Sequence, residues 1–231
     1  MCSLVTSSTR IGTAYGRAIL ALLILILPTA TALLPAANAQ EGTPAPAPVV
    51  RVEEDWQLVL NEPGESLTAP QFHTVMSPFD HLNVAYAQVS WNYRELPEFA
   101  AGGLQLQAWG PDFDLSHHAL RVDSLSLDAE TITWTQQLLT DGMRIRFRIT
   151  NGESLSWSSF GGLWSFIDIP LALPNLNQYS PDVSAANSWI TYGSNRVTSL
   201  KILQVRRYAA DGTLLSVDDT PRVIYQMNDG L

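Results

Sequence analysis

Apolar and polar residues alternate along several stretches of this 231-residue chain. The clearest stretches are residues 83–94, 103–109, 131–139, 143–150 and 196–208. A period of two is typical of a β-strand with one buried face, because successive side chains of a strand point to opposite sides. No stretch of ten or more residues shows the spacing of an amphipathic helix. The pattern therefore predicts an all-β protein.

Turn residues punctuate these stretches. Asp141-Gly142 and Asp211-Gly212 each lie between two strand-like runs, and Asp-Gly is a strong signal for a tight hairpin. Each of these short strands must bury one face, and packing against a second sheet buries it. We therefore predict a two-sheet antiparallel β-sandwich, preferably of the jelly-roll (concanavalin-like) type.

The first hairpin can be given a register. A two-residue turn at 141–142 pairs Thr140 with Met143. On the face expected to be buried, the same register gives three further pairs: Leu138 with Ile145, Gln136 with Phe147, and Trp134 with Ile149. The opposite face then carries the arginine stripe Arg144, Arg146 and Arg148. Such a stripe is either the solvated side of a half-buried sheet, which we favour, or a binding surface.

The N-terminus has a different pattern. Arg10 and Arg17 precede an apolar run at 18–27, and a small-residue site ends at Ala39. This order predicts a secretory signal peptide, residues 1–39, cleaved after Ala39. The alternative is an uncleaved anchor, but the apolar run at 18–34 is interrupted by proline and is shorter than the roughly 20 residues that span a bilayer.

The remainder of the chain divides simply. Residues 40–50 alternate proline with alanine and predict an extended linker. Residues 51–231 show no second linker and no internal repeat, so we expect a single domain. The protein is then secreted, into the periplasm, to the cell surface or into the medium, with no membrane contact after cleavage.

Charge and cysteine content narrow the function. Without Arg10 and Arg17, the chain keeps 22 acidic and 11 basic residues, a formal charge of −11. Such an acidic chain argues against nucleic acid as a partner, because phosphate binding needs a basic surface. The single cysteine, Cys2, leaves with the signal peptide, so we expect no disulfide, no cysteine nucleophile and no thiolate metal site.

Several segments carry a resemblance. They resemble a family of uncharacterised secreted bacterial proteins, over nearly the whole mature domain: VEEDW (52–56), APQ (69–71), GGLQLQAW (102–109), WTQ (134–136), NGESLSWSSFGG (151–162) and ANSWITYGSNRVTSL (186–200). The resemblance implies no activity and no site residues. A vaguer similarity of 134–152 to concanavalin-like sandwiches concerns the fold alone.

The tryptophans divide into two groups. Trp134 is buried in the hairpin register, and Trp56, Trp91 and Trp157 lie on runs where burial is expected. The second group lies beside turns, and we expect one of its three rings to be exposed: Trp109, Trp164 and Trp189. An exposed tryptophan is a candidate for ligand contact.

A polar strand face offers a candidate binding surface. If Leu104 and Leu106 point inward, the other face of 103–109 carries two amides and an aromatic ring, which suit sugar hydroxyls and sugar rings. The candidate ligand-binding residues, drawn from this face and the arginine hairpin, are Gln105, Gln107, Trp109, Gln137, Arg146 and Arg148.

A candidate metal site lies in PDFDLSHH. Its carboxylates and imidazoles are suitable ligands for a divalent ion: Asp112, Asp114, His117 and His118. The alternative is a solvated loop, since adjacent histidines of a strand point to opposite faces. No cofactor is otherwise expected, although calcium suits an acidic secreted sandwich. The eligible loop acids are Asp80, Asp112, Asp114, Asp182, Asp218 and Asp219.

Three functions remain open. The chain has no Gly-x-Ser-x-Gly motif, so we favour a non-catalytic binding or structural module of the cell exterior, with an extracellular polysaccharide as partner. The enzymatic alternative is a carbohydrate-active hydrolase or lyase, for which the sequence nominates no carboxylate pair. The third is a purely structural envelope protein that associates through sheet edges.

Overall fold

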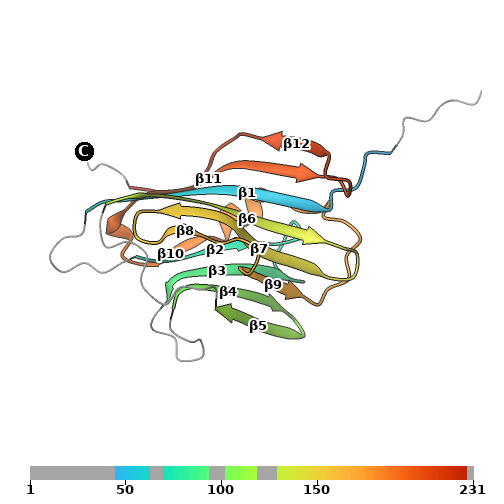
Figure 1. Ribbon diagram of the computed structural model, residues 1–231, viewed down its shortest axis with the longest axis horizontal. Helices are drawn as coiled ribbons and strands as arrows, with labels where there is room; N and C mark the ends of the chain where they lie inside the picture. The colour runs from blue at the N-terminus through green and yellow to red at the C-terminus, as the bar shows by residue number, and fades with distance from the viewer. Residues whose placement is uncertain (1–44, 63–69, 94–101, 119–128, 228–231) are drawn as a thin grey trace, which may run out of the picture. The chain divides into compact units, whose positions relative to one another are not determined.

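The computed structural model describes residues 45–62, 70–93, 102–118 and 129–227 (Figure 1). Residues 45–231 belong to one compact unit. The predicted signal peptide lies outside the described residues. Within the described ranges, no helix is long and apolar enough to cross a membrane.

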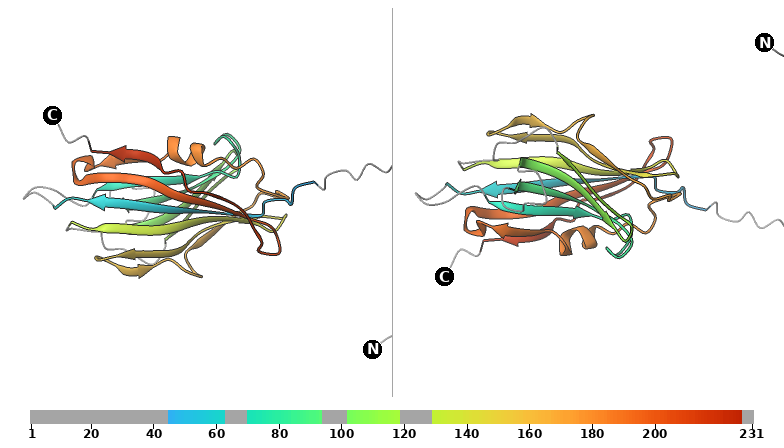
Figure 2. Two further views of the ribbon diagram at one scale, coloured as in Figure 1. Left: turned by 90° about the horizontal axis from the view of Figure 1, so that it is seen from above. Right: turned by 90° about the horizontal axis from the view of Figure 1, so that it is seen from below.

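The strands form two antiparallel sheets. The larger has the order β12-β11-β1-β6-β7-β8, with β13 also paired to β11 and β9 to β7. Its strands are β1 (Arg51–Leu60), β6 (Thr131–Thr140), β7 (Ile145–Ser154), β8 (Ser158–Phe160), β9 (Phe166–Ile169), β11 (Val197–Tyr208), β12 (Leu214–Asp218) and β13 (Arg222–Gln226). Figure 2 shows β1 between β11 and β6 from above.

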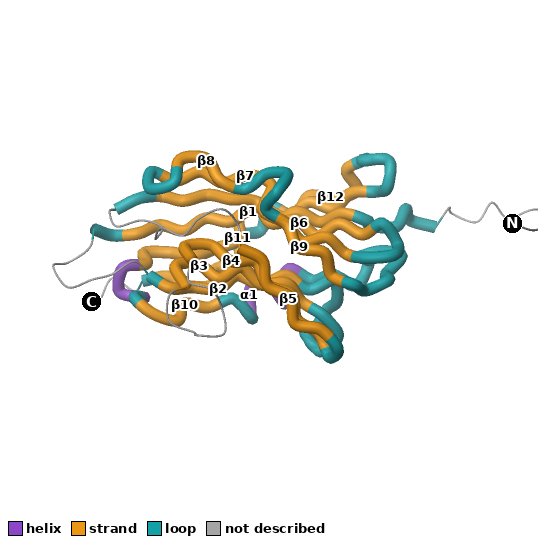
Figure 3. Tube along the Cα trace, turned by 60° about the horizontal axis from the view of Figure 1, so that its bottom comes forward, coloured by secondary structure: helices purple, strands orange, loops and turns teal. Residues whose placement is uncertain are grey.

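The smaller sheet has the order β10-β2-β3-β4-β5. Its strands are β2 (Gln71–Met76), β3 (Tyr86–Tyr93), β4 (Gly102–Gly110), β5 (Phe113–His118) and β10 (Trp189–Tyr192). A short helix, α1 (Pro181–Ala186), and a 3₁₀ turn, Ser194–Arg196, flank β10. Figure 3 shows the sheets as two layers, and the two-sheet antiparallel β-sandwich expected from the sequence is confirmed.

An aromatic cluster joins the two sheets. Trp91 of β3 stacks on Phe72 of β2, with ring centroids 5.2 Å apart, and lies 4.6 Å from the ring of Trp134 in β6. Trp134 in turn stacks on Trp56 of β1, and Trp157 lies beside Trp91. The four tryptophans predicted to be buried are therefore in the core, where each aromatic pair adds about 0.5–1.5 kcal/mol beyond burial.

The turn between β6 and β7 is longer than predicted. Thr140 pairs with Ile145, so the expected pairing with Met143 is wrong. The reason is local, because Asp141 Oδ1 accepts hydrogen bonds from the backbone N–H groups of Met143 and Arg144, at 2.9 and 3.0 Å. The aspartate side chain thereby closes a four-residue turn in place of the two-residue one.

The other predicted pairs of this hairpin are displaced as well. Leu138 pairs with Phe147 and Gln136 with Ile149, each two residues beyond the predicted partner, and a bulge after Thr135 places Trp134 opposite Gly152. A displacement of two residues leaves each side chain on its original face. Arg146 and Arg148 therefore still point outward from β7, whereas Arg144 lies in the turn.

Candidate functional site

The arginine stripe is paired with acids and amides of the same sheet face. Arg146 forms a two-point ion pair with Asp168, with Nε–Oδ1 and Nη2–Oδ2 distances of 2.7 and 2.9 Å. Arg148 Nε donates to Gln137 Oε1 at 2.7 Å, and Gln137 Nε2 donates to Glu53 at 2.7 Å. Three of the predicted ligand-binding residues thus already have partners within the sheet.

The same network continues onto the neighbouring strands. Arg206 of β11 donates to both carboxylate oxygens of Asp55, at 2.7 and 2.8 Å, and to Glu53 at 3.2 Å. Asp55 also accepts a hydrogen bond from Thr135. These contacts favour the interpretation of this face as the solvated, ion-paired side of a sheet.

The six predicted ligand-binding residues do not form one surface. Gln137, Arg146 and Arg148 lie on the larger sheet, whereas Gln105, Gln107 and Trp109 lie on β4 of the smaller sheet. Leu104 and Leu106 belong to the core between the sheets, so the two glutamines point away from it. The two groups are on separate outer faces of the sandwich.

The outward side of the smaller sheet is polar, and we call it the polar face. Cross-strand register places Trp189 opposite His73, His73 opposite Ser90, and Ser90 opposite Gln105. The next row along places Gln88 opposite Gln107. The five central residues of the polar face are buried: His73, Gln88, Ser90, Gln105 and Gln107.

A hydrogen-bond network links three strands across the polar face. Gln88 Nε2 donates to Gln107 Oε1 at 2.9 Å and lies 3.0 Å from His73 Nδ1 and 3.1 Å from Ser90 Oγ. Ser90 Oγ lies 2.9 Å from the same histidine nitrogen. Because the hydroxyl and the amide both supply hydrogens, the arrangement is satisfied when His73 Nδ1 accepts.

Burial keeps His73 uncharged. Its removal from water lowers the pKa of the imidazole to about 4. The ring is therefore neutral at neutral pH, and the polar face consists of dipoles with no central charge.

Two buried amide atoms of the polar face have no partner among the described residues. Within the described residues, Gln105 Oε1 and Gln107 Nε2 are buried and make no hydrogen bond. An unsatisfied buried polar atom destabilises a protein by about 1–3 kcal/mol, so a bound water or ligand is the usual explanation. One acceptor and one donor, two residues apart on β4 and shielded from solvent, thus have hydrogen-bonding capacity that no described residue uses.

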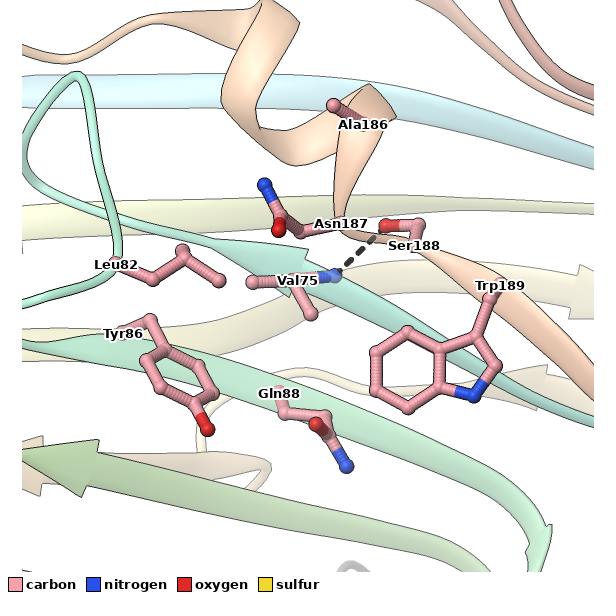
Figure 4. A pocket seen from close by; sticks show the side chains of 8 residues that line it. All are labelled: Val75, Leu82, Tyr86, Gln88, Ala186, Asn187, Ser188 and Trp189. Carbon is pink, nitrogen blue, oxygen red and sulfur yellow. Dashed lines mark hydrogen bonds between the residues drawn. The ribbon is translucent and has the colours of Figure 1, made fainter.

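A pocket of about 270 Å³ adjoins the polar face (Figure 4). Its side chains surround Val75 of β2. They come from the β2–β3 loop, from β3, from the end of α1 with the two residues after it, and from β10: Leu82, Tyr86, Gln88, Ala186, Asn187, Ser188 and Trp189. Ser188 Oγ accepts from the backbone N–H of Val75 at 3.0 Å and donates to the carbonyl of Ser184 at 2.8 Å. These bonds fix the segment that leads into Trp189.

Trp189 is the aromatic wall of this pocket. Its ring stacks on His73, with centroids 4.6 Å apart and planes 30° apart, yet 45% of the residue is exposed. The sequence marked Trp189 as one of three tryptophans of which one was expected to be exposed. Trp164, in the turn before β9, is exposed as well.

Sequence reasoning missed Tyr86 and Gln88. The signal was present in the alternating run 83–94, which puts Tyr86, Gln88 and Ser90 on one face of β3. Burial, followed by the charge of nearby Asp114, raises the pKa of the Tyr86 phenol. Tyr86 is therefore a neutral hydroxyl group that can both donate and accept.

The predicted metal residues lie around β5. Asp112, in the β4–β5 turn, and Asp114, on β5, are both exposed. His117 and His118 also belong to β5, but the structure does not describe their side chains. Among the described side chains, no three histidine, cysteine or acidic groups are placed to hold a metal. Asp182 and Asp218, two candidate calcium ligands, both pair with Arg222, at 2.7 and 2.8 Å. The metal and calcium assignments stay predictions.

The described residues define a two-sheet β-sandwich with a polar face that has no charge at its centre and an adjoining pocket. No protein-family model matches the chain, and no curated protein matches it in sequence. A crystal structure of scytalido-glutamic peptidase with a peptide-based transition state analog matches at 12% identity and a TM-score of 0.31, covering 76% of this chain and 82% of that one. A second, with a transition state analog inhibitor, matches at 14% identity and a TM-score of 0.29 over the same shares. Both scores are too low to assign a function.

Proposed function

We propose that this protein is a non-catalytic module of the cell exterior that binds a neutral polysaccharide through the polar face. The observation that carries the proposal is that Gln105 Oε1 and Gln107 Nε2 have no hydrogen-bond partner in the part of the chain that the structure describes. Amides recognise hydroxyl groups because each offers both a donor and an acceptor. Trp189 lies on β10, on one side of these amides, and the Tyr86–Trp109 ring pair, 6.5 Å between centroids, flanks them farther along the sheet. Aromatic rings at such positions suit the apolar faces of sugars.

Charge supports a neutral ligand. His73 is uncharged at neutral pH, and Asp114 is close enough to Tyr86 to influence its pKa. The chain carries a net charge of −9. An acidic protein repels uronic or sulfated polymers, and no described residue of the polar face is a cation that could pair with them. Neutral polymers are therefore favoured.

The test is affinity electrophoresis of the purified protein in gels containing neutral, uronic or sulfated polysaccharides. We expect retardation by at least one neutral polymer. Gln107→Leu should weaken this retardation about tenfold, because a lost hydrogen bond to a ligand corresponds to roughly 1–1.5 kcal/mol. Arg146→Ala, on the other sheet, is the matched control and should bind normally. Retardation by no polymer, or loss only with Arg146→Ala, contradicts the proposal.

A hydrolase is the second candidate, supported by one contact. Ser90 Oγ lies 2.9 Å from His73 Nδ1, the distance at which a histidine can activate a serine nucleophile. Both residues are buried, and His73 also contacts Gln88, which is why we rank this function second. Shortening of the polymer during incubation, lost in Ser90→Ala, would establish it.

A further inference from the structure

We propose that the Trp189 pocket binds a single neutral sugar ring, as the subsite for one end of the polysaccharide. This inference deepens the proposed function and rests on it for the identity of the polymer. The pocket itself is separate from the two unpartnered amides, because it lies over Val75, on the β10 side of Gln88.

The size of the pocket sets the size of its ligand. Pockets for drug-sized molecules measure about 300–1,000 Å³, and the Trp189 pocket measures about 270 Å³. One six-membered sugar ring fits such a volume, whereas several consecutive rings do not. A longer chain must therefore leave the pocket and continue along the surface.

The aromatic wall is held in place before any ligand arrives. The indole of Trp189 rests on the imidazole of His73, and His73 is held by Ser90 and Gln88. The backbone before Trp189 is fixed through the two hydrogen bonds of Ser188. An aromatic ring that is fixed in this way loses little conformational entropy when a ligand stacks on it.

Three polar groups can receive the sugar hydroxyls. Gln88 uses its Nε2 in the network of the polar face, which leaves Oε1 as an acceptor. Asn187 donates its Nδ2 to the carbonyl of Val183 at 2.8 Å, which leaves Oδ1. Tyr86 supplies a hydroxyl that donates or accepts. Figure 4 shows these three side chains and Trp189 around the same space.

Gln88 joins the pocket to the rest of the polar face. Its amide lines the pocket and donates to Gln107 Oε1, and Gln107 Nε2 is one of the two unpartnered atoms. A chain whose end occupies the pocket is thereby directed across β3 toward β4. None of the described lining residues is charged, so the end group is a neutral sugar and not a uronic acid.

The test uses saturation-transfer NMR and tryptophan fluorescence titration of the purified protein with methyl glycosides of neutral hexoses and of hexuronic acids. We expect at least one neutral glycoside to bind saturably and the uronic acids not to bind. Trp189→Ala should weaken the binding about tenfold or more, and Trp189→Phe should retain part of it. The matched control is Trp164→Ala, which removes another exposed tryptophan, from the turn before β9. Near-UV circular dichroism checks that each variant folds.

The outcomes separate this inference from the proposed function. Normal glycoside binding by Trp189→Ala, or binding by no glycoside, overturns the Trp189 subsite. If Trp189→Ala still binds the polymer and Gln107→Leu does not, the proposed function stands without the subsite. Conversely, glycoside binding that depends on Trp189, in a protein that retains no polymer, supports the subsite and contradicts the proposed function.

Discussion

Glu54 is a carboxylic acid buried in the domain interior. It lies on β1, fully buried, and accepts hydrogen bonds from the Tyr179 hydroxyl at 2.5 Å and from Trp56 Nε1 at 2.9 Å. Burial raises the pKa of Glu54 to about 7, and these hydrogen bonds and the charge of Arg222 oppose that rise. The same burial, together with Glu54, raises the pKa of Tyr179.

This carboxyl makes stability depend on pH. The folded protein keeps Glu54 protonated up to about pH 7, whereas the unfolded chain releases the proton near pH 4.5. The folded state therefore keeps a proton on Glu54 that the unfolded chain has lost, and Glu54 by itself lowers the free energy of unfolding by roughly 1.4 kcal/mol per pH unit through this window. His73, whose pKa is lowered from 6.5 to about 4, has the opposite effect below about pH 6.5, in the wild type and in the variant alike. Glu54→Gln, which resembles the protonated acid, should therefore gain stability relative to the wild type as the pH rises from 5 to 7. Urea unfolding at pH 5, 6 and 7 measures it, with exposed Glu153→Gln as the control. A Glu54→Gln curve parallel to that of the wild type would refute the assignment.

At the scale of elements, the turn between β6 and β7 depends on a backbone conformation that favours glycine. Gly142 has a φ of +87°, and a Cβ added there meets no atom within 4 Å. Any penalty for alanine therefore comes from the backbone alone. Gly142→Ala should lower the free energy of unfolding by about 1 kcal/mol, while Gly142→Asn, which tolerates positive φ, should lower it less. Denaturant titration of both variants compares them, and equal stability of wild type and Gly142→Ala would rule out this explanation.

The same turn shows what the sequence could and could not predict. The alternation of Ile145 to Ile149 was sufficient to identify the inward and outward faces, because it depends only on the period of a strand. The register depended on the side chain of Asp141, which competes with the two-residue turn that Asp-Gly favours. β1 was not recognised as a strand, because its alternate charged residues include Glu54, which points inward.

The candidate site was predictable only in part. Alternation within β4 correctly pointed Gln105 and Gln107 away from the core. The pocket could not be predicted, because its wall combines β2 and β3 with Trp189, about a hundred residues later in the chain. Local periodicity carries no information about which distant segment a strand pairs with. For this reason the sequence left open whether Gln137 and Arg148 share a sheet with the β4 amides, and the structure places them on the other sheet.

For the whole molecule, the exposed edge of the larger sheet matters most for association. β12 is an outer strand of that sheet and exposes Leu214, Leu215 and Val217. An edge strand with unpaired backbone groups and apolar side chains is a surface to which another strand can add. This edge is the observation that supports the third function considered, a structural protein that associates through its sheets.

If the protein associates through the edge of β12, the apparent mass of the protein should rise with its concentration. Val217→Lys should reduce that rise, because a lysine on an edge strand disfavours the addition of another strand. Light scattering over a hundredfold range of concentration measures the effect. Leu163→Lys, in an exposed turn outside the strands, is the matched control. A constant mass in the unmodified protein would argue against association through this edge.

The central position of β1 also governs how the domain can fold. β1 begins the described sandwich, yet it pairs with β11, joining Arg51 to Tyr208 and Leu60 to Val197, across 157 and 137 residues of chain. Contacts between such distant segments form slowly, because a large loop must close before any pairing energy is gained. During synthesis β1 therefore has an open side until β11 has left the ribosome. The late completion of the larger sheet keeps the chain unfolded for longer, and that delay suits a polypeptide that is predicted to cross a membrane before it folds.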